Sequence, residues 1–469
     1  MQTRNIVATL LSGSSSIFSW AVSAVPPNTA PTTSAKFKRI SFRKLVFIGL
    51  ILGGQLSLAQ AEVTNNTLTL NTALNRALEQ NPSLKVFDFR NTALTGQLET
   101  AGLKPAYELG LEAENFSGSD ELSGFDGAEL TVSLSSVLEM GDKRAARRGI
   151  VSNSRSVLDA QRQVESLALL GEVTRRYVDV LAAQEQVSLA KEADELASQT
   201  LKIVKKRASA GATPDAEVKR AQAAASQVHL TLLSSRQQLA YLKVSLAALW
   251  GETSPKFATI DGDLFHFGTD VEFEMLYAKM EKNPAIQIFA AENRLKEAEV
   301  RLAQTQSKAD ISWSVGARRF QESDTSALVA GFSMPLFSSK RNSGAVSTAL
   351  AQRNEIFVQK EVALLNMHTQ LFRAFHNREQ AILAAKELQN TIIPALDEAL
   401  KETQTAYQRG RYGYLEYVSA RQELLSARRT LIESASSALT YGAEIEQLTA
   451  EPLSATQYGE STELSGSVQ

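Results

Sequence analysis

The chain has 469 residues, contains no cysteine and carries a formal net charge of −2 at pH 7. The lack of cysteine excludes disulfide bonds, thiolate metal sites, cysteine catalysis and a lipid anchor on an N-terminal cysteine. The near-neutral charge argues against nucleic acid as a partner, since nucleic-acid binding requires a basic face.

The first predicted element is an export leader over residues 1–61. Its signal peptide, residues 36–61, begins with a segment rich in Lys and Arg and continues with an apolar run from Leu45 to Leu58. Ala59 and Ala61 then supply the small side chains that signal peptidase needs. The apolar run is too short for a transmembrane helix, which needs ~20 residues. No later run approaches that length, so the sequence predicts no helical membrane span.

The rest of the chain contains one pattern twice, at a spacing of about 200 residues. Asn81-Pro82 recurs as Asn283-Pro284, and Lys143-Arg144 recurs as Lys340-Arg341. Each copy reads as a short helix, a medium helix, two strands, a very long helix and a long return helix. We therefore predict a first structural repeat over 62–260, a second repeat over 261–450 and a disordered tail rich in Ser, Thr, Glu and Gly over 451–469.

Two runs in each repeat alternate apolar and polar residues, which is typical of half-buried strands. Leu109, Val132, Trp313 and Phe332 each belong to the apolar face of one run. Each run has about the length that a tilted strand needs to cross a bilayer, ~9–11 residues. A soluble antiparallel sheet is the commoner source of such a pattern. The four runs cover residues 107–116, 129–138, 310–317 and 328–336.

The long helices favour a membrane sheet over a soluble one. Residues 143–207 are dominated by helix formers and would reach roughly 95 Å at 1.5 Å per residue. Residues 343–407 match this length, and Pro394 is expected to kink or divide that helix. The return helices are predicted over 214–250 and 414–449.

Tight turns are predicted between the long and return helices. In the first turn Gly211 breaks the helix, Thr213 is expected to be the N-cap, and Pro214 is expected at the first helical position. In the second turn Gly410 and Gly413 allow the reversal.

Four strands per chain are too few to close a membrane barrel, whose smallest bacterial form has about eight. An open strand edge in lipid would leave its N–H and C=O groups unsatisfied. Several identical chains would therefore share one barrel, and their hairpins would project together around a pore. The alternative of another class is a soluble periplasmic coiled-coil scaffold or adaptor, which explains the helices but not the four alternating runs.

Residues 62–450 resemble the TolC-type outer-membrane efflux protein family. The segments similar to the second hairpin of that family are Ile393-Pro-Ala-Leu-Asp-Glu-Ala-Leu400, Tyr407-Gln-Arg-Gly410 and Leu415-Glu-Tyr-Val-Ser-Ala-Arg-Gln422. Leu138-Glu-Met-Gly-Asp-Lys-Arg-Ala-Ala-Arg147 resembles the branch that serves cobalt–zinc–cadmium efflux.

The resemblance implies a mixed α+β membrane protein, mostly α, in the outer membrane of a Gram-negative bacterium. It implies a homotrimer whose 12-stranded β-barrel, four strands per chain, continues into a long coiled-coil α-helical barrel in the periplasm. The implied partners are a periplasmic membrane-fusion adaptor, an inner-membrane pump of the resistance–nodulation–division type, and outer-membrane lipid. The expected function is passive conduction of heavy-metal cations, and drug efflux or type I protein secretion remain alternatives.

The resemblance also places the hairpin tips at the periplasmic mouth, although turn chemistry alone explains the glycines and the proline. The residues expected at the tip or in contact with the adaptor are Gly211, Pro214, Asp215, Gly410, Gly413 and Tyr414. The candidates for a pore constriction are Asp215, Glu217, Glu416 and Tyr417, since an acidic ring favours cations. The acids expected to face the lumen from the strands are Glu108, Glu112, Glu114 and Glu129.

The sequence offers no catalytic constellation, so we expect neither an enzyme nor a cofactor. The four histidines are scattered, and His368 and His376 are eight positions apart. Two metal ligands on one helical face would be three or four apart. No metal site is therefore predicted.

Overall fold

The computed structural model describes residues 67–119, 124–268 and 271–452. The predicted leader, with Ala59 and Ala61, and residues 453–469 of the predicted tail lie outside this part of the chain. The described residues all belong to one compact unit, so the two halves of the pattern do not separate into independent domains.

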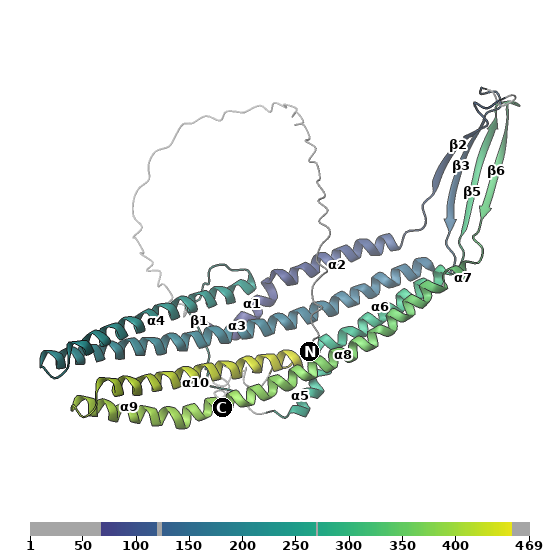
Figure 1. Cartoon of the computed structure of the whole chain (residues 1–469). Coiled ribbons are helices and arrows are strands. Elements are labelled where there is room, and N and C mark those ends of the chain that lie inside the picture. The colour runs from purple at the N-terminus through teal and green to yellow at the C-terminus, as the bar shows by residue number, and fades with distance from the viewer. Residues whose placement is uncertain (1–66, 120–123, 269–270, 453–469) are drawn as a thin grey trace, which may run out of the picture. The chain divides into compact units, whose positions relative to one another are not determined.

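Helices make up most of the described chain, and the order of elements in the first half recurs in the second (Figure 1). The first half contains β1 (Thr67–Leu68), α1 (Leu70–Gln80), α2 (Pro82–Ala101), β2 (Glu108–Glu114), β3 (Glu129–Leu138), α3 (Lys143–Ser209), α4 (Asp215–Ala247) and a 3₁₀ turn (Ala248–Trp250). The second half contains β4 (Thr259–Ile260), α5 (Phe273–Met280), α6 (Pro284–Gln306), β5 (Ile311–Phe320), β6 (Thr325–Ser333), α7 (Ser338–Arg341), α8 (Ser343–Glu387), a π turn (Leu388–Ile392), α9 (Ile393–Gln408) and α10 (Tyr414–Thr449).

The repeated Asn-Pro pair begins a helix in both halves. The side chains of Asn81 and Asn283 accept hydrogen bonds from the amides of Ser83 (2.7 Å) and Ala285 (2.8 Å), and each proline occupies the first helical position. This is N-capping by the residue type that favours it. The side-chain Nδ2 of Asn81 donates to the carbonyl of Leu249, at the end of the first return helix. The side-chain Nδ2 of Asn283 donates to the carbonyl of Leu448, at the end of the second. The same side chain thus caps one helix and fastens the end of another.

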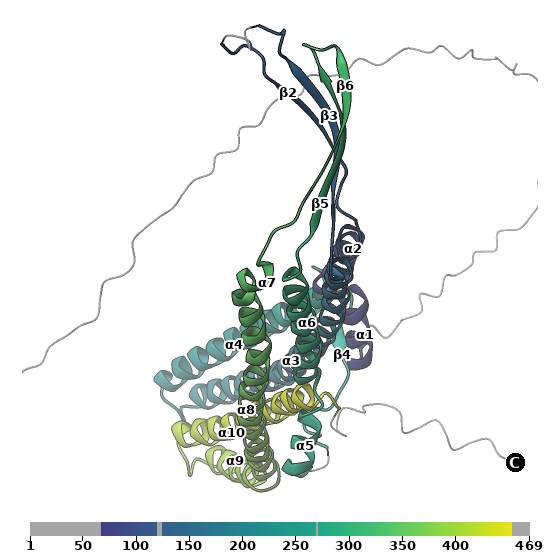
Figure 2. The same ribbon diagram turned by 90° about the vertical axis from the view of Figure 1, so that its right-hand side faces the viewer.

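The four longer strands form one antiparallel sheet in the order β2-β3-β5-β6, which extends away from the helix ends (Figure 2). Its register pairs Leu111 with Val132, Val132 with Ala317, and Ala317 with Leu328. Paired residues of antiparallel strands point to the same face, so the apolar face predicted from the alternation is continuous across all four strands. Within the described residues, β2 and β6 each pair with one strand of this sheet and form its edges.

The long helix of the second half is divided near Pro394, as the sequence predicts. The π turn lies directly before this proline, between α8 and α9. Proline has no amide hydrogen and crowds the preceding turn, so the backbone widens there instead of continuing as a regular α-helix. The corresponding helix of the first half, α3, is continuous over 67 residues.

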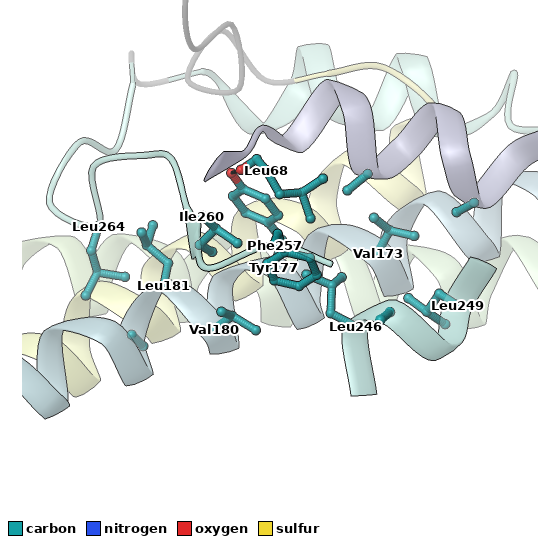
Figure 3. Packing of buried hydrophobic residues seen from close by; sticks show 14 of the residues in the cluster. Leu68, Val173, Tyr177, Val180, Leu181, Leu246, Leu249, Phe257, Ile260 and Leu264 are labelled. Atoms are coloured by element: carbon teal, nitrogen blue, oxygen red, sulfur yellow. Dashed lines mark hydrogen bonds between the residues drawn. The ribbon is translucent and has the colours of Figure 1, made fainter. Parts of the chain in front are cut away.

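The largest core cluster lies at mid-length of α3, where the short strands β1 and β4 pair in parallel (Figure 3). Val173, Tyr177 and Val180 of α3 pack there with Leu68 of β1 and Ile260 of β4. The Tyr177 hydroxyl lies 2.9 Å from the carbonyl oxygen of Leu68. One segment from each half is thereby held against the same helix.

Among the described residues, no helix is both long enough and apolar enough to cross a membrane.

Candidate functional site at the helical hairpin tips

The two hairpin turns have the same backbone conformation. Gly211 and Gly410 both have a φ of 74°, a left-handed value that glycine adopts without strain. Both glycines are exposed, as are Pro214 and Gly413. These turn residues therefore form an accessible surface at the end of each hairpin.

The predicted capping of α4 is wrong. Pro214 is the cap residue, with extended backbone angles, Asp215 is the first helical residue, and no side chain caps the helix. The hydroxyl of Thr213 is buried and accepts a hydrogen bond from Nε of Arg207 at 3.3 Å. The Thr213 hydroxyl, which was expected to cap α4, is instead hydrogen-bonded to Arg207 of the preceding helix α3.

A cluster of tyrosines joins the two hairpins behind the turns. Tyr407, Tyr414 and Tyr417 are buried and pack with Val204 of α3 and Ala221 of α4. The rings of Tyr407 and Tyr417 are stacked, with centroids 5.4 Å apart and planes 6° apart. Tyr417 is only 4% exposed, and this burial argues against the hypothesis that it constricts a pore. Tyr414, at 8% exposure, likewise has little surface to offer an adaptor.

Arg207 of the first hairpin reaches the second. Its guanidinium carbon lies 4.6 Å from the ring centroid of Tyr407, and it donates a hydrogen bond to the Tyr407 carbonyl. A cation over an aromatic face is attracted by the ring quadrupole, so this one side chain ties the hairpins together. Another arginine, Arg421 of α10, is buried and donates to the hydroxyl of Thr200 of α3 at 3.2 Å.

Burial shifts the pKa values of two tyrosines of the cluster. It raises the pKa values of Tyr407 and Tyr414, and the charge of Glu217 raises both further. Arg207 opposes the shift at Tyr407, and Arg421 opposes it at Tyr414. Both phenols are therefore neutral at physiological pH, and the hydroxyl of Tyr407 has no hydrogen-bond partner among the described residues.

The acidic candidates lie in the first turns of the return helices. Asp215 and Glu217 begin α4, and Glu416 lies in the first turn of α10. A carboxylate there is favoured by the helix dipole. Asp215 and Glu416 are exposed and Glu217 is half-buried. The carboxylate of Glu416 folds back over Gly413, where an added Cβ would lie 2.7 Å from its Oε2 atom.

The strand acids share one face of the sheet, but they are not equivalent. Glu114 pairs with Glu129 across β2 and β3, and Thr131 pairs with Arg318 of β5. Arg318 forms ion pairs with both acids, at 2.8 Å to Glu114 and 2.9 Å to Glu129.

Glu108 and Glu112, also on this face, have no ion-pair partner in the described part of the chain. The ion pairs of Arg318 were not predicted, although the alternation of β5 places Arg318 on the polar face.

Within the described ranges, no three His, Cys, Asp or Glu side chains are grouped to hold a metal ion. His376 contacts Glu379 at 3.1 Å, and His368 packs edge-on against Phe273 and Tyr277. The tip arginines Arg207 and Arg421, together with Tyr407, were not among the predicted site residues. Their roles depend on partners about 200 positions away, which no local pattern reveals.

Known proteins are similar to this chain in sequence. The family model described as outer membrane efflux protein matches residues 73–252. The cobalt-zinc-cadmium resistance protein CzcC of Cupriavidus metallidurans is 25% identical over 361 residues, which cover 77% of this chain and 85% of CzcC. The nickel-cobalt-cadmium resistance protein NccC of Alcaligenes xylosoxydans xylosoxydans is 23% identical over 314 residues, 66% of this chain and 70% of NccC.

The fold has counterparts among solved structures as well. The outer membrane protein VceC of Vibrio cholerae superposes with a TM-score of 0.62 at 19% identity, over 82% of this chain and 96% of VceC. The paired hairpins and the small open sheet therefore form the same fold as this outer membrane protein. Over residues 73–252 the chain is similar to the outer membrane efflux protein family, and it is similar in sequence to the heavy-metal resistance proteins CzcC and NccC.

Proposed function

We propose that the chain is the outer-membrane duct of a tripartite efflux system that passively conducts heavy-metal cations out of the cell. A periplasmic adaptor and an inner-membrane pump of the resistance–nodulation–division type would supply the cations. The names of CzcC and NccC specify cobalt, zinc, cadmium and nickel, and they support this class of cargo.

The open sheet is the observation that carries the proposal. Leu109 and Leu328 on its apolar face are 79% and 88% exposed in the single chain, and strands β2 and β6 have free edges within the described residues. In lipid the unpaired N–H and C=O groups of such edges would be unsatisfied, and pairing with the strands of further copies of the chain would satisfy them. Three copies supply twelve strands, an even number within the bacterial range. A ten-residue strand such as β3 rises about 33 Å, and at a tilt of ~40° it crosses an apolar band of ~25 Å.

Aromatic contacts at both ends of the sheet support the same orientation. Tyr107 and Trp313 pack edge to face at 6.3 Å near the helices, and Phe116 and Phe125 stack at 6.3 Å near the opposite end. Transmembrane barrels carry aromatic girdles at the two membrane interfaces. The spacing of these pairs along the strands fits a sheet that spans the outer membrane, with the helices in the periplasm.

The hairpin tips then form the periplasmic mouth. The exposed turns at Gly211, Pro214, Gly410 and Gly413 would meet the adaptor, and an acidic ring from Asp215 would favour cations. Glu217 and Glu416 are further candidates for such a ring, and the unpaired acids Glu108 and Glu112 would give the upper lumen the same preference.

Membrane fractionation tests the duct directly. The protein should be found in the outer membrane and migrate as a trimer on a gel when it is not heated. A soluble periplasmic monomer would contradict the proposal and favour a coiled-coil scaffold instead.

A further inference from the structure

Exposed cations gather where the strands join the helices. They flank all four strand–helix connections, and we call them the junction cations: Lys104, Arg144, Arg148, Lys308, Lys340 and Arg341. Lys104 and Lys308 precede strands β2 and β5, and the other four follow strands β3 and β6. The doublet that recurs in the sequence thus marks the same place in both repeats.

The junction cations lack partners, whereas their neighbours have them. Lys143 pairs with Asp310 at 2.7 Å, and Arg147 pairs with Glu139 at 2.9 Å. These pairs neutralise two of the acids at the junction. No junction cation has an ion-pair partner in the part of the chain that the structure describes. The exposed acids near them are Glu99, Glu108 and Asp142, so the six unpaired cations give the junction an excess of positive charge.

The junction cations lie beside the aromatic residues of the sheet. Tyr107 follows Lys104 by three residues, Trp313 follows Lys308 by five, and Phe337 precedes Lys340 by three. Beyond them the exposed face of the sheet is aliphatic. Cations, then aromatic rings, then aliphatic side chains is the order expected across a membrane interface. Long Lys and Arg side chains there extend their charges toward the headgroups.

The opposite end of the sheet has the reverse charge. In the turn between β5 and β6, Arg319 is paired with Asp324, and Glu322 is exposed without a partner among the described residues. Asp126, before β3, is also exposed. The excess of cations is therefore confined to the helical end of the strands.

We infer that the junction cations bind the phosphate groups of anionic phospholipid headgroups in the membrane leaflet that faces the helices. This inference rests on the proposed function, because it requires the sheet to span the outer membrane. Lys and Arg form strong, charge-assisted hydrogen bonds with phosphate. A cationic cargo would be repelled by these six charges, so a role for them in conduction does not explain them. Binding of headgroups would fix the depth of the sheet in the bilayer.

Insertion of the purified, natively assembled protein into vesicles tests the inference. The vesicles contain phosphatidylcholine alone or phosphatidylcholine with phosphatidylglycerol, and inserted protein is measured by flotation. The test variant combines Arg144→Gln, Arg148→Gln, Lys340→Gln and Arg341→Gln. The matched control removes four exposed, unpaired cations near the hairpin tips by Lys202→Gln, Lys205→Gln, Lys219→Gln and Arg220→Gln.

The unaltered protein and the control should insert more efficiently when phosphatidylglycerol is present, and high salt should abolish the difference. Each cation near an anionic surface contributes roughly fivefold to partitioning, so the test variant should lose at least about tenfold of this preference. Its insertion into phosphatidylcholine should be unchanged, which also shows that the variant folds.

The inference would be overturned if the test variant kept the same preference for phosphatidylglycerol vesicles as the unaltered protein. It would also be overturned if the control variant lost as much of this preference as the test variant. Loss of the preference on adding inorganic phosphate at constant ionic strength would also overturn it, in favour of a site for the free ion. In these cases insertion into phosphatidylcholine vesicles would still support the proposed function as an outer-membrane duct. Failure to insert into any vesicle would overturn the inference and the proposed function together.

Discussion

Arg207 covers the ring of Tyr407 at 4.6 Å and donates to the carbonyl of the same residue, although the two are 200 positions apart. The contact joins equivalent places in the two halves, each a few residues before the glycine of its hairpin turn. The contact lies against the buried tyrosine cluster, and a cation–π contact shielded from water is stronger than an exposed one. The relative position of the hairpins therefore depends strongly on this pair.

Replacing Arg207 should loosen the tips. Arg207→Ala removes the cation–π contact and the hydrogen bonds to Tyr407 and Thr213, so about 1–3 kcal/mol of local stability should be lost. Amide hydrogen exchange should accelerate in residues 204–214 and 404–414. Lys206→Ala is the control, since Lys206 is exposed beside Arg207 and has no side-chain partner among the described residues. Equal protection in both variants would show that the tyrosine packing alone holds the hairpins.

Neutralising Asp215 should reduce the cation preference of the mouth. Asp215→Asn keeps the shape of an exposed side chain and removes one charge per chain, or three from the proposed trimer. Reversal potentials in planar bilayers with asymmetric salt should show lower cation selectivity. Asp159→Asn, which changes an exposed acid in the first third of α3, is the control. Unchanged conductance and selectivity would remove Asp215 from the candidates and leave Glu217 and Glu416 to be examined.

Replacing an asparagine that caps a helix should destabilise the protein more than replacing an asparagine on the surface. Asn283 is 1% exposed, and its replacement by Ala removes the cap of α6 and leaves the carbonyls of Gln447 and Leu448 without their donor. We expect a loss of about 2–4 kcal/mol, the sum of a lost cap and unsatisfied buried groups. Urea unfolding of the detergent-solubilised protein measures it.

Asn283→Asp separates the two roles of this side chain, because aspartate can cap but cannot donate. It should be destabilising despite its capping ability. Asn91→Ala, on the exposed surface of α2, should have little effect. If Asn283→Ala were as mild as Asn91→Ala, the link between helix ends would contribute nothing to stability.

Glu172 should make the helical region sensitive to acid. Burial alone would raise its pKa, but hydrogen bonds from Arg176 (2.7 Å) and Arg175 (3.1 Å) lower the pKa below the usual value. A carboxyl with a lowered folded-state pKa stabilises the protein above its unfolded pKa, and this stability is lost as the pH falls through the folded pKa. Glu172→Gln should therefore reduce the difference in melting temperature between neutral and acidic pH. Glu195→Gln, exposed on the same helix, should leave that difference as it is.

The regular elements were predictable because their periods are local. The helix predicted over 143–207 is found as Lys143–Ser209, and the alternating runs are found as strands with the predicted apolar face. The partners of individual side chains were not predictable. A period of two places Glu114 and Glu129 on one face, but only the register brings Arg318 between them.

The tips show the same limit. Local rules assigned Thr213 to a helix cap and left Tyr414 and Tyr417 as surface residues. In the structure Thr213 accepts a hydrogen bond from Arg207, and the rings of Tyr414 and Tyr417 are buried by packing between distant segments. The tyrosines are buried by contacts between the two halves of the chain. The residue pattern within one repeat does not reveal its contacts with the other repeat.

Growth of a deletion strain on divalent metals tests the central claim most directly. The strain would be exposed to zinc, cobalt, cadmium and nickel, with several antibiotics in parallel, and the gene would be returned on a plasmid. A heavy-metal efflux duct predicts hypersensitivity to the metals that the returned gene reverses, with little change toward the drugs. Sensitivity confined to the antibiotics would contradict the proposed cargo.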